Sequence, residues 1–187
     1  IRRKERASVV ADRVGQLPGG LVCHYNLPRP MTHRGRTFWM TGSQAIAIDG
    51  PVASGKTAVG GLVAKLLGCG FLDTGLMYRA VTQVALERTI DLQDAPALTN
   101  LAESLSVGVS AARGADGLVV EGREVAESLR DGAVERGVSL VASVPGVRRA
   151  LVQRQRDIAS AGPIVMMGRD IGTVVLTDAA AKIYLTA

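Results

Sequence analysis

The sequence predicts an α/β fold in which helices wrap a parallel β-sheet. Two short apolar runs, Ala45–Asp49 and Pro163–Gly168, have the composition of strands buried on both faces. Apolar residues at helical spacing follow the first run over residues 56–67 and precede the second over residues 147–159. Strands that alternate with helices in this way form parallel sheets, which bind ligands at the carboxyl ends of their strands.

The first half of this pattern continues beyond the first helix. We expect a short strand that ends near Asp73, a helix over residues 75–88 and a further helix up to Leu105. Asp94 followed by Pro96 is typical of a helix start, because the carboxylate accepts free amide protons and proline fits the first turn. These elements are spaced as successive units of one α/β domain over residues 44–187.

Residues 106–130 differ in character and predict a small β-rich insertion. Short apolar pieces are separated by a polar stretch in which Asp116-Gly117 is a hairpin signal. After the insertion, we expect helices over residues 131–141 and 147–159, the buried strand at 163–168 and a last strand over residues 182–186.

The turn between the first strand and the first helix carries the motif G-x-x-x-x-G-K-[ST], with Gly50, Gly55, Lys56 and Thr57 at its fixed positions. Glycines allow the backbone amides of such a P-loop to approach a polyphosphate closely, and the helix start adds a favourable dipole. The lysine reaches the β- and γ-phosphates and the threonine hydroxyl binds Mg²⁺. The sequence therefore predicts a nucleoside triphosphate and Mg²⁺ as ligands and a P-loop NTPase-like fold. The expected contacts with the triphosphate, which the resemblance given below implies is ATP, are Gly50, Pro51, Val52, Ala53, Ser54, Gly55, Lys56 and Thr57.

The excess positive charge belongs to residues 1–43. This segment holds eight Lys or Arg against two acidic residues, whereas residues 44–187 hold fourteen against fifteen. The net charge of the whole chain is +5. Because the body of the chain is not basic, we expect no nucleic-acid partner. The segment lacks a clean period and opens on Ile1, so we expect a basic, disordered leader or a foreign extension, with Met31 and Met40 as candidate start sites.

Composition limits the remaining classes. No apolar stretch approaches the ~20 residues of a membrane span, so we expect no membrane partner. Cys23 and Cys69 lie far apart in unrelated contexts, which argues against a disulfide framework and fits a cytoplasmic protein. No heptad pattern suggests a coiled coil, and we expect a monomer.

Four segments together resemble the bacterial cytidylate kinases, which belong to the nucleoside monophosphate kinase superfamily. The P-loop is one, and the others are FLDTGLMYRAVT (residues 71–82), VSLVASVPGVRRALVQRQRDIA (138–159) and GRDIGTVVLTDAAAKIYLTA (168–187). The resemblance implies transfer of the ATP γ-phosphoryl group to CMP or dCMP. It also implies that the insertion enlarges the region that binds the monophosphate.

The resemblance assigns roles to individual residues. Lys56 and Arg169 would be catalytic, and Arg79 and Arg169 would bind phosphate, as forked guanidinium groups do well. Tyr78 would pack against the nucleotide and Thr74 would contact it. The polar groups that would read cytosine are Ser139, Arg148 and Asp170.

Two departures from the family pattern affect these expectations. Met167 precedes Gly-Arg-Asp where the family usually has Asp or Glu, and a thioether is a poor Mg²⁺ ligand, which leaves Asp49 as the candidate for an indirect metal contact. Relatives continue beyond the strand at 182–186 through an arginine-bearing lid. We therefore expect either a fragment of a longer kinase or a truncated, non-catalytic module that binds nucleotides. A third alternative is another P-loop kinase, acting on shikimate, dephospho-CoA or AMP.

Overall fold

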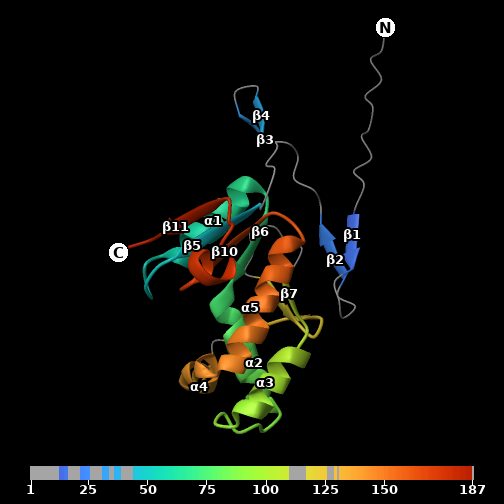
Figure 1. Ribbon diagram of the computed structural model, residues 1–187, viewed down its shortest axis with the longest axis vertical. Coiled ribbons are helices and arrows are strands. Elements are labelled where there is room, and N and C mark those ends of the chain that lie inside the picture. Colours follow the sequence, from blue (N-terminus) through green and yellow to red (C-terminus); the bar gives the residue numbers. More distant parts are fainter. Residues whose placement is uncertain are drawn as a thin grey trace.

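A four-stranded parallel sheet forms the centre of the molecule in the computed structural model, which describes residues 13–16, 22–25, 31–33, 36–38, 44–109, 117–125, 129 and 131–186 (Figure 1). The strand order is β11-β5-β10-β6. The strands are β5 (Ala45–Asp49), β6 (Gly70–Asp73), β10 (Ile164–Gly168) and β11 (Ala181–Tyr184). The predicted α/β fold and its parallel sheet are thereby confirmed.

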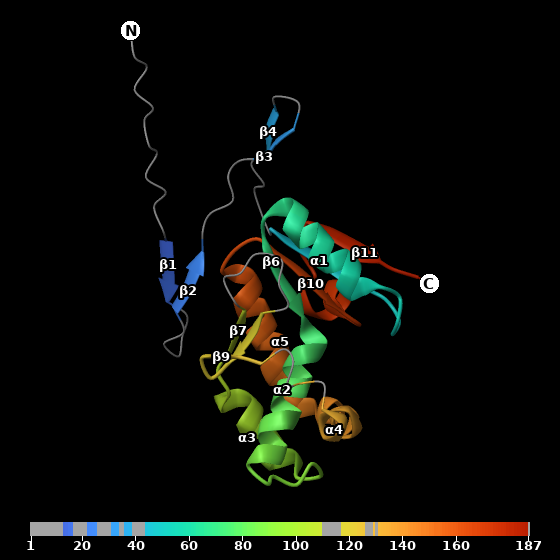
Figure 2. The same ribbon diagram turned by 180° about the vertical axis from the view of Figure 1, so that it is seen from behind.

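Different helices cover the two faces of the sheet. Helix α1 (Lys56–Leu67) packs through Ala64 on a small cluster that includes Ile48, Phe71 and Met167. The opposite face belongs to a larger core shared with α2 (Thr74–Glu87), α3 (Ala95–Ser104), α4 (Gly132–Ser143) and α5 (Pro145–Ser160). Figure 2 shows α1 beside the sheet, whereas α2 and α5 extend away from it toward α3 and α4. Apolar residues on both faces of β5 and β10 explain why these strands lack the alternation of a half-exposed strand.

Aspartates begin three of the helices. Asp73 accepts a hydrogen bond from the Gly75 N–H at 2.9 Å, Asp94 from Ala97 at 2.9 Å and Asp131 from Ala133 at 2.6 Å. Each bond satisfies an amide that has no partner within its own helix. The helix start predicted at Asp94 is confirmed, with Ala95 as the first helical residue.

The predicted β-rich insertion is a three-stranded antiparallel sheet of β7 (Val107–Val109), β8 (Leu118–Val120) and β9 (Arg123–Glu124). The antiparallel pairing of β7 with β8 confirms a hairpin. Asp116 of its predicted turn lies outside the described residues. Val107, Leu118 and Val120 are buried in the larger core, so the insertion is part of the same domain.

Four short strands are described in residues 1–43. Strand β1 (Arg13–Gln16) pairs antiparallel with β2 (Val22–Tyr25), and β3 (Met31–His33) pairs antiparallel with β4 (Arg36–Phe38). Most of this segment lies outside the described residues, and the disordered leader stays a prediction. Among the helices that the structure describes, none combines the length and apolarity needed to cross a membrane.

Helices α3 and α5 approach so closely at Gly146 that a side chain does not fit. A Cβ at Gly146 would lie 2.5 Å from the Cγ2 of Thr99, and Gly146 itself is buried. We expect Gly146→Ala to lower the free energy of unfolding by about 1–3 kcal/mol, because overpacking forces the helices apart. Denaturant titration measures this change. The control is Gly61→Ala on α1, where a Cβ meets nothing within 4 Å, so stability should stay equal or rise by about 0.5–1 kcal/mol. Equal effects at both glycines would contradict the tight α3–α5 contact.

Candidate functional site

The carboxyl ends of three neighbouring strands bring the predicted motifs together. In the parallel register, Gly168 lies opposite Asp49 and Met167 lies opposite Asp73. The P-loop follows β5, helix α2 follows β6, and the segment that begins with Arg169 follows β10. Segments separated by more than ninety residues in the sequence therefore leave the sheet at one edge, where ligands bind in folds of this kind.

The P-loop has the backbone of an anion-binding loop. Ala53 (φ 63°) and Gly55 (φ 81°) adopt left-handed conformations, and Gly55 begins α1 without a side-chain hydrogen bond to its amides. The first amides of a helix have no partner within the helix, and together with the positive end of its dipole they favour a bound anion. Gly50 (φ 153°) lets the loop start close to β11, because a Cβ there would collide with the carbonyl oxygen of Leu185.

Lys56 and Thr57 occupy the first turn of α1 beside this loop. The Lys56 ammonium donates to the carbonyl oxygen of Pro51 and to the Ser54 hydroxyl at 3.3 Å. It therefore lies across the loop whose amides would bind phosphate. Thr57 is exposed, so its hydroxyl is accessible to a ligand. The structure thus places the predicted ATP contacts on one continuous surface.

Asp49 and Met167 are the two residues on which the metal prediction depends, and neither is exposed beside the P-loop. Asp49 is 8% exposed, and its carboxylate accepts from the N–H groups of Ile171 (2.7 Å) and Gly172 (2.8 Å). Met167 is buried in the apolar cluster under α1 and presents no oxygen ligand. In the part of the chain that the structure describes, no three His, Cys, Asp or Glu side chains gather where they could hold a metal ion. Thr57 is the predicted ligand that fits Mg²⁺, and the indirect role of Asp49 stays a prediction.

Three predicted acceptor residues meet between α2, α5 and the end of β10. Arg148 of α5 approaches Asp170 with 3.6 Å between Nη2 and Oδ2. Burial raises the pKa of the Tyr78 hydroxyl, and smaller opposing contributions come from the nearby charges of Arg148, which lowers it, and Asp170, which raises it. Tyr78 is thus partly buried beside a cation and an anion, an arrangement suited to the ring and polar edge of a base.

A second contact joins helix α2, which carries Arg79, to helix α4, which carries Ser139. The Arg79 guanidinium is 2.5 Å from Oε2 of Glu135 on α4 and also donates to the Leu129 carbonyl at 3.4 Å. The hydrogen bond and the charge of Arg79 hold the pKa of Glu135 below its ordinary value. Ser139 is exposed one turn after Glu135, on the same side of α4. Arg79 therefore connects α2 to α4, the helix that also carries Ser139.

Thr74 and Arg169 lie where the end of β10 meets the start of α2 in space. Thr74 is buried, and its hydroxyl donates to the Met167 carbonyl at 2.9 Å, so a nucleotide contact would use its acceptor lone pairs. Gly168 permits this packing, because a Cβ there would lie 2.5 Å from the Thr74 hydroxyl oxygen. Arg169 is exposed directly after β10. The geometry thus brings most predicted contacts to one edge and leaves their individual roles as proposals.

Sequence reasoning missed two charged residues, one that pairs with Arg79 and one that contacts the segment after Asp170. Glu135 was not singled out, because no motif marks it and its partner Arg79 lies on another helix. Arg156 was also missed, although it donates to the carbonyls of Val174 and Val175 just beyond Arg169-Asp170. The arginine-rich sequence of residues 148–156 was the available signal, but helical spacing alone does not say which arginine reaches the segment after β10.

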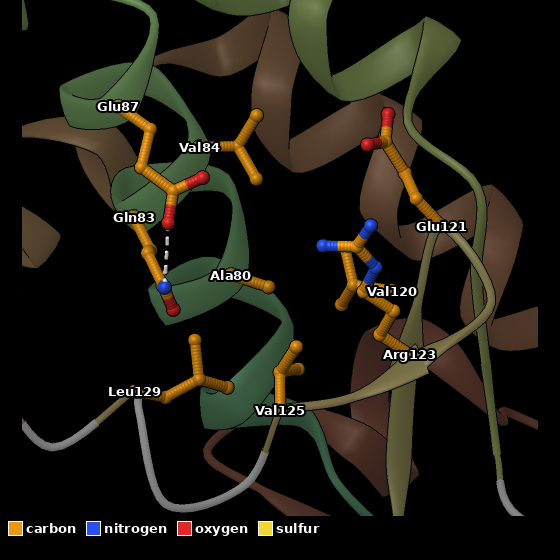
Figure 3. A pocket seen from close by; sticks show the side chains of 9 residues that line it. All are labelled: Ala80, Gln83, Val84, Glu87, Val120, Glu121, Arg123, Val125 and Leu129. Carbon is orange, nitrogen blue, oxygen red and sulfur yellow. Dashed lines mark hydrogen bonds between the residues drawn. The ribbon is translucent and has the colours of Figure 1, made fainter.

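A pocket of about 290 Å³ lies elsewhere, between α2 and the small sheet (Figure 3). Its apolar surface comes from Ala80, Val84, Val120, Val125 and Leu129. The charged or polar residues around it are Gln83, Glu87, Glu121 and Arg123, and Gln83 donates to Glu87 at 2.7 Å. Two carboxylates beside one guanidinium do not favour a phosphate, and the predicted nucleotide contacts do not line this pocket.

Comparison with known proteins agrees with the motifs. The family model described as cytidylate kinase matches residues 46–187. The chain belongs to the cytidylate kinase family. This confirms the resemblance stated from the four segments.

Individual members of the family are similar over the same region. The cytidylate kinase of Pelotomaculum thermopropionicum is 51% identical over 143 residues, which cover 76% of this chain and 63% of that relative. The cytidylate kinase of Herpetosiphon aurantiacus is 49% identical over 80% of this chain and 67% of its own length. A bifunctional pantoate ligase/cytidylate kinase of a Synechococcus species is 48% identical, with 27% of its length matched. The chain spans about 63% of the length of the first of these cytidylate kinases.

Proposed function

We propose that this cytidylate kinase family member transfers the γ-phosphoryl group of ATP to the 5′-phosphate of CMP and dCMP. The observation that carries the proposal is the shared sheet edge, where the P-loop after β5 lies beside the segment after β10. One provides backbone amides and Lys56 for a triphosphate, and the other provides Arg169, Asp170 and the adjoining Arg148 for a nucleotide. The names of the relatives support cytidylate as the acceptor.

On the donor side, the chain binds and aligns the triphosphate. The amides at the start of α1 and the Lys56 ammonium would contact the phosphate oxygens, replacing the contacts that Lys56 now makes with Pro51 and Ser54. The Thr57 hydroxyl would hold Mg²⁺, which would supply positive charge to neutralise the transferred group. These contacts keep the γ-phosphorus accessible to the acceptor.

On the acceptor side, guanidinium groups hold the attacking phosphate. A nucleoside monophosphate carries nearly two negative charges at neutral pH, and Arg79 and Arg169 provide the matching positive charge. An acceptor phosphate oxygen bonds to the γ-phosphorus as the bond to the β-phosphate oxygen breaks, which releases ADP. No general base is needed, since the attacking oxygen is already anionic, and alignment and charge neutralisation account for the rate.

Recognition of cytosine would depend on the polar residues around Tyr78. Cytosine presents an amino donor beside two acceptors, so Asp170 suits the amino group and Arg148 or Ser139 suits an acceptor. The Arg148–Asp170 contact orients both side chains before the base binds. A base with the reverse pattern would leave these groups unpaired, which disfavours uridylate.

Initial-rate measurements with a set of acceptors test the function. With ATP as donor, we expect CMP and dCMP to have values of kcat/KM at least about tenfold above those of UMP, AMP, shikimate and dephospho-CoA. Preference for AMP, shikimate or dephospho-CoA would overturn the choice of substrate. Calorimetric binding of ATP and CMP without any turnover would instead favour a non-catalytic nucleotide-binding module.

The finer parts of the assignment are proposals of the same kind. We infer that Mg²⁺ is the metal ion, that the protein acts as a monomer in the cytoplasm, and that nucleic acids and membranes are not its partners. The near-neutral charge of residues 44–187 supports the absence of a nucleic-acid surface.

A further inference from the structure

The segment after β10 continues into a π-helical turn, η2 (Ile171–Val175). Its wider hydrogen bonds run from the Val175 N–H to the Asp170 carbonyl (3.3 Å) and from the Leu176 N–H to the Ile171 carbonyl (2.7 Å). Such turns are rare and are frequently found at functional sites. η2 starts directly after Arg169 and Asp170, so its position determines where these two residues lie.

A carboxylate holds the beginning of η2. Both oxygens of Asp49 accept from η2, one from the Ile171 N–H at 2.7 Å and the other from the Gly172 N–H at 2.8 Å. These are charge-assisted bonds in a buried place, and they lie near the positive end of the turn. A Cβ at Gly172 would make tight contacts there, at 3.2 Å from Lys182 Cδ and 3.3 Å from Asp49 Oδ2. Asp49 thus joins the P-loop strand directly to η2.

A guanidinium holds the end of η2. Arg156 of α5 donates from Nε to the Val175 carbonyl at 3.0 Å and from Nη2 to the Val174 carbonyl at 2.8 Å. Carbonyls at the end of a helical turn lack intrahelical partners and carry partial negative charge, which a cation there satisfies. Arg148, about two turns earlier on α5, contacts Asp170 just before η2. Helix α5 therefore touches this segment at both ends.

We propose that Asp49 and Arg156 are positioning residues that fix η2 at its two ends and so set the places of Arg169 and Asp170. The inference rests on the proposed function, because Arg169 and Asp170 are there assigned to the acceptor. The two residues act on the acceptor half through the backbone and need not touch the substrate. The position of Asp49 in β5 also links the donor loop and the acceptor segment to one strand.

Arg156→Met tests the proposal at the end that lies away from the P-loop. We expect the dissociation constant of CMP to rise about tenfold, because small displacements of aligned groups are costly. The dissociation constant of ATP should stay within about twofold, since Arg156 contacts η2 and not the P-loop. Calorimetric titration of the whole chain with CMP and ATP separately gives both values. Arg156→Lys keeps the charge but loses the paired donors and should lie in between.

Hydrogen–deuterium exchange supplies a readout that does not depend on activity. Arg156→Met and Asp49→Asn should each speed exchange in a peptide covering residues 169–176, because each removes bonds that hold η2. The matched control is Arg154→Met, on the same helix but about 160° around it from Arg156. This variant should resemble the wild type in exchange and in CMP binding.

The outcomes separate the inference from the function on which it rests. Unchanged exchange in residues 169–176, or unchanged CMP affinity in Arg156→Met, would overturn the positioning role. Equal weakening of CMP and ATP together with a lower Tm would also overturn it, because that pattern indicates general destabilisation. A wild-type chain that binds ATP but not CMP would instead overturn the proposed function, and the exchange data would still decide whether Asp49 and Arg156 hold η2.

Discussion

Replacing Lys56 with alanine should reduce phosphoryl transfer from ATP by about 10³-fold or more, because the loop loses the cation that we propose meets the transferred phosphate. In the structure, the Lys56 ammonium lies across the P-loop on Pro51 and Ser54, so it is already placed beside the amides of α1. CMP binding should change by less than about threefold, since the acceptor residues lie on α2, α4, α5 and the β10–η2 segment. Initial rates and separate titrations with ATP and CMP measure the three quantities.

Lys65→Ala is the matched control for this substitution. Lys65 is an exposed lysine in the last turn of the same helix, away from the loop. Its removal should leave turnover and both affinities near the wild-type values. Loss of CMP affinity equal to the loss of ATP affinity in Lys56→Ala would mean that the two ligands do not occupy separate halves of the site.

Replacing Arg79 with methionine should weaken CMP binding by about 10²-fold, because the guanidinium that we propose pairs with the acceptor phosphate is removed. The free energy of unfolding should change little, since Glu135, the partner of Arg79 in the structure, is exposed. Arg79→Lys keeps the charge without the forked donors and should recover only part of the affinity. Titration with CMP and denaturant unfolding check the two effects.

Arg88→Met is the control that separates loss of CMP affinity from loss of a surface ion pair. Arg88 also pairs with an exposed glutamate, Glu121, at 2.9 Å, and it directly follows the helix that carries Arg79. Its loss should alter stability about as little as the loss of Arg79 and leave CMP affinity unchanged. If both variants bind CMP equally well, Arg79 does not contact the acceptor phosphate.

The fold was predictable because its signals are local. The strand at 45–49 and the helix at 56–67 have the bounds expected from apolar runs and a fixed loop motif. Asp94 marked its helix correctly, because capping depends on residues three positions apart. The antiparallel insertion was also predictable, since short β-rich pieces between turn residues are typical of hairpins.

The features that could not be predicted from the sequence depend on contacts between distant residues. The π-helical turn at 171–175 has no sequence signature, because it forms where Asp49 and Arg156 satisfy its end groups from other elements. The pair between Arg79 and Glu135 joins two helices whose packing the periodicity of either helix does not reveal. The motifs therefore located the candidate site, whereas its internal hydrogen bonds required the three-dimensional arrangement.

The strand order separates β5 from both of its partners by a long stretch of chain. Strand β5 starts at Ala45, yet its two neighbours start at Ile164 and Ala181, and the next strand in sequence, β6, is not adjacent to it. During synthesis, the strand before the P-loop must wait for more than a hundred further residues before it can pair. Closing such long loops slows folding, so we expect β5 to join the sheet only after β10 and β11 have been synthesised.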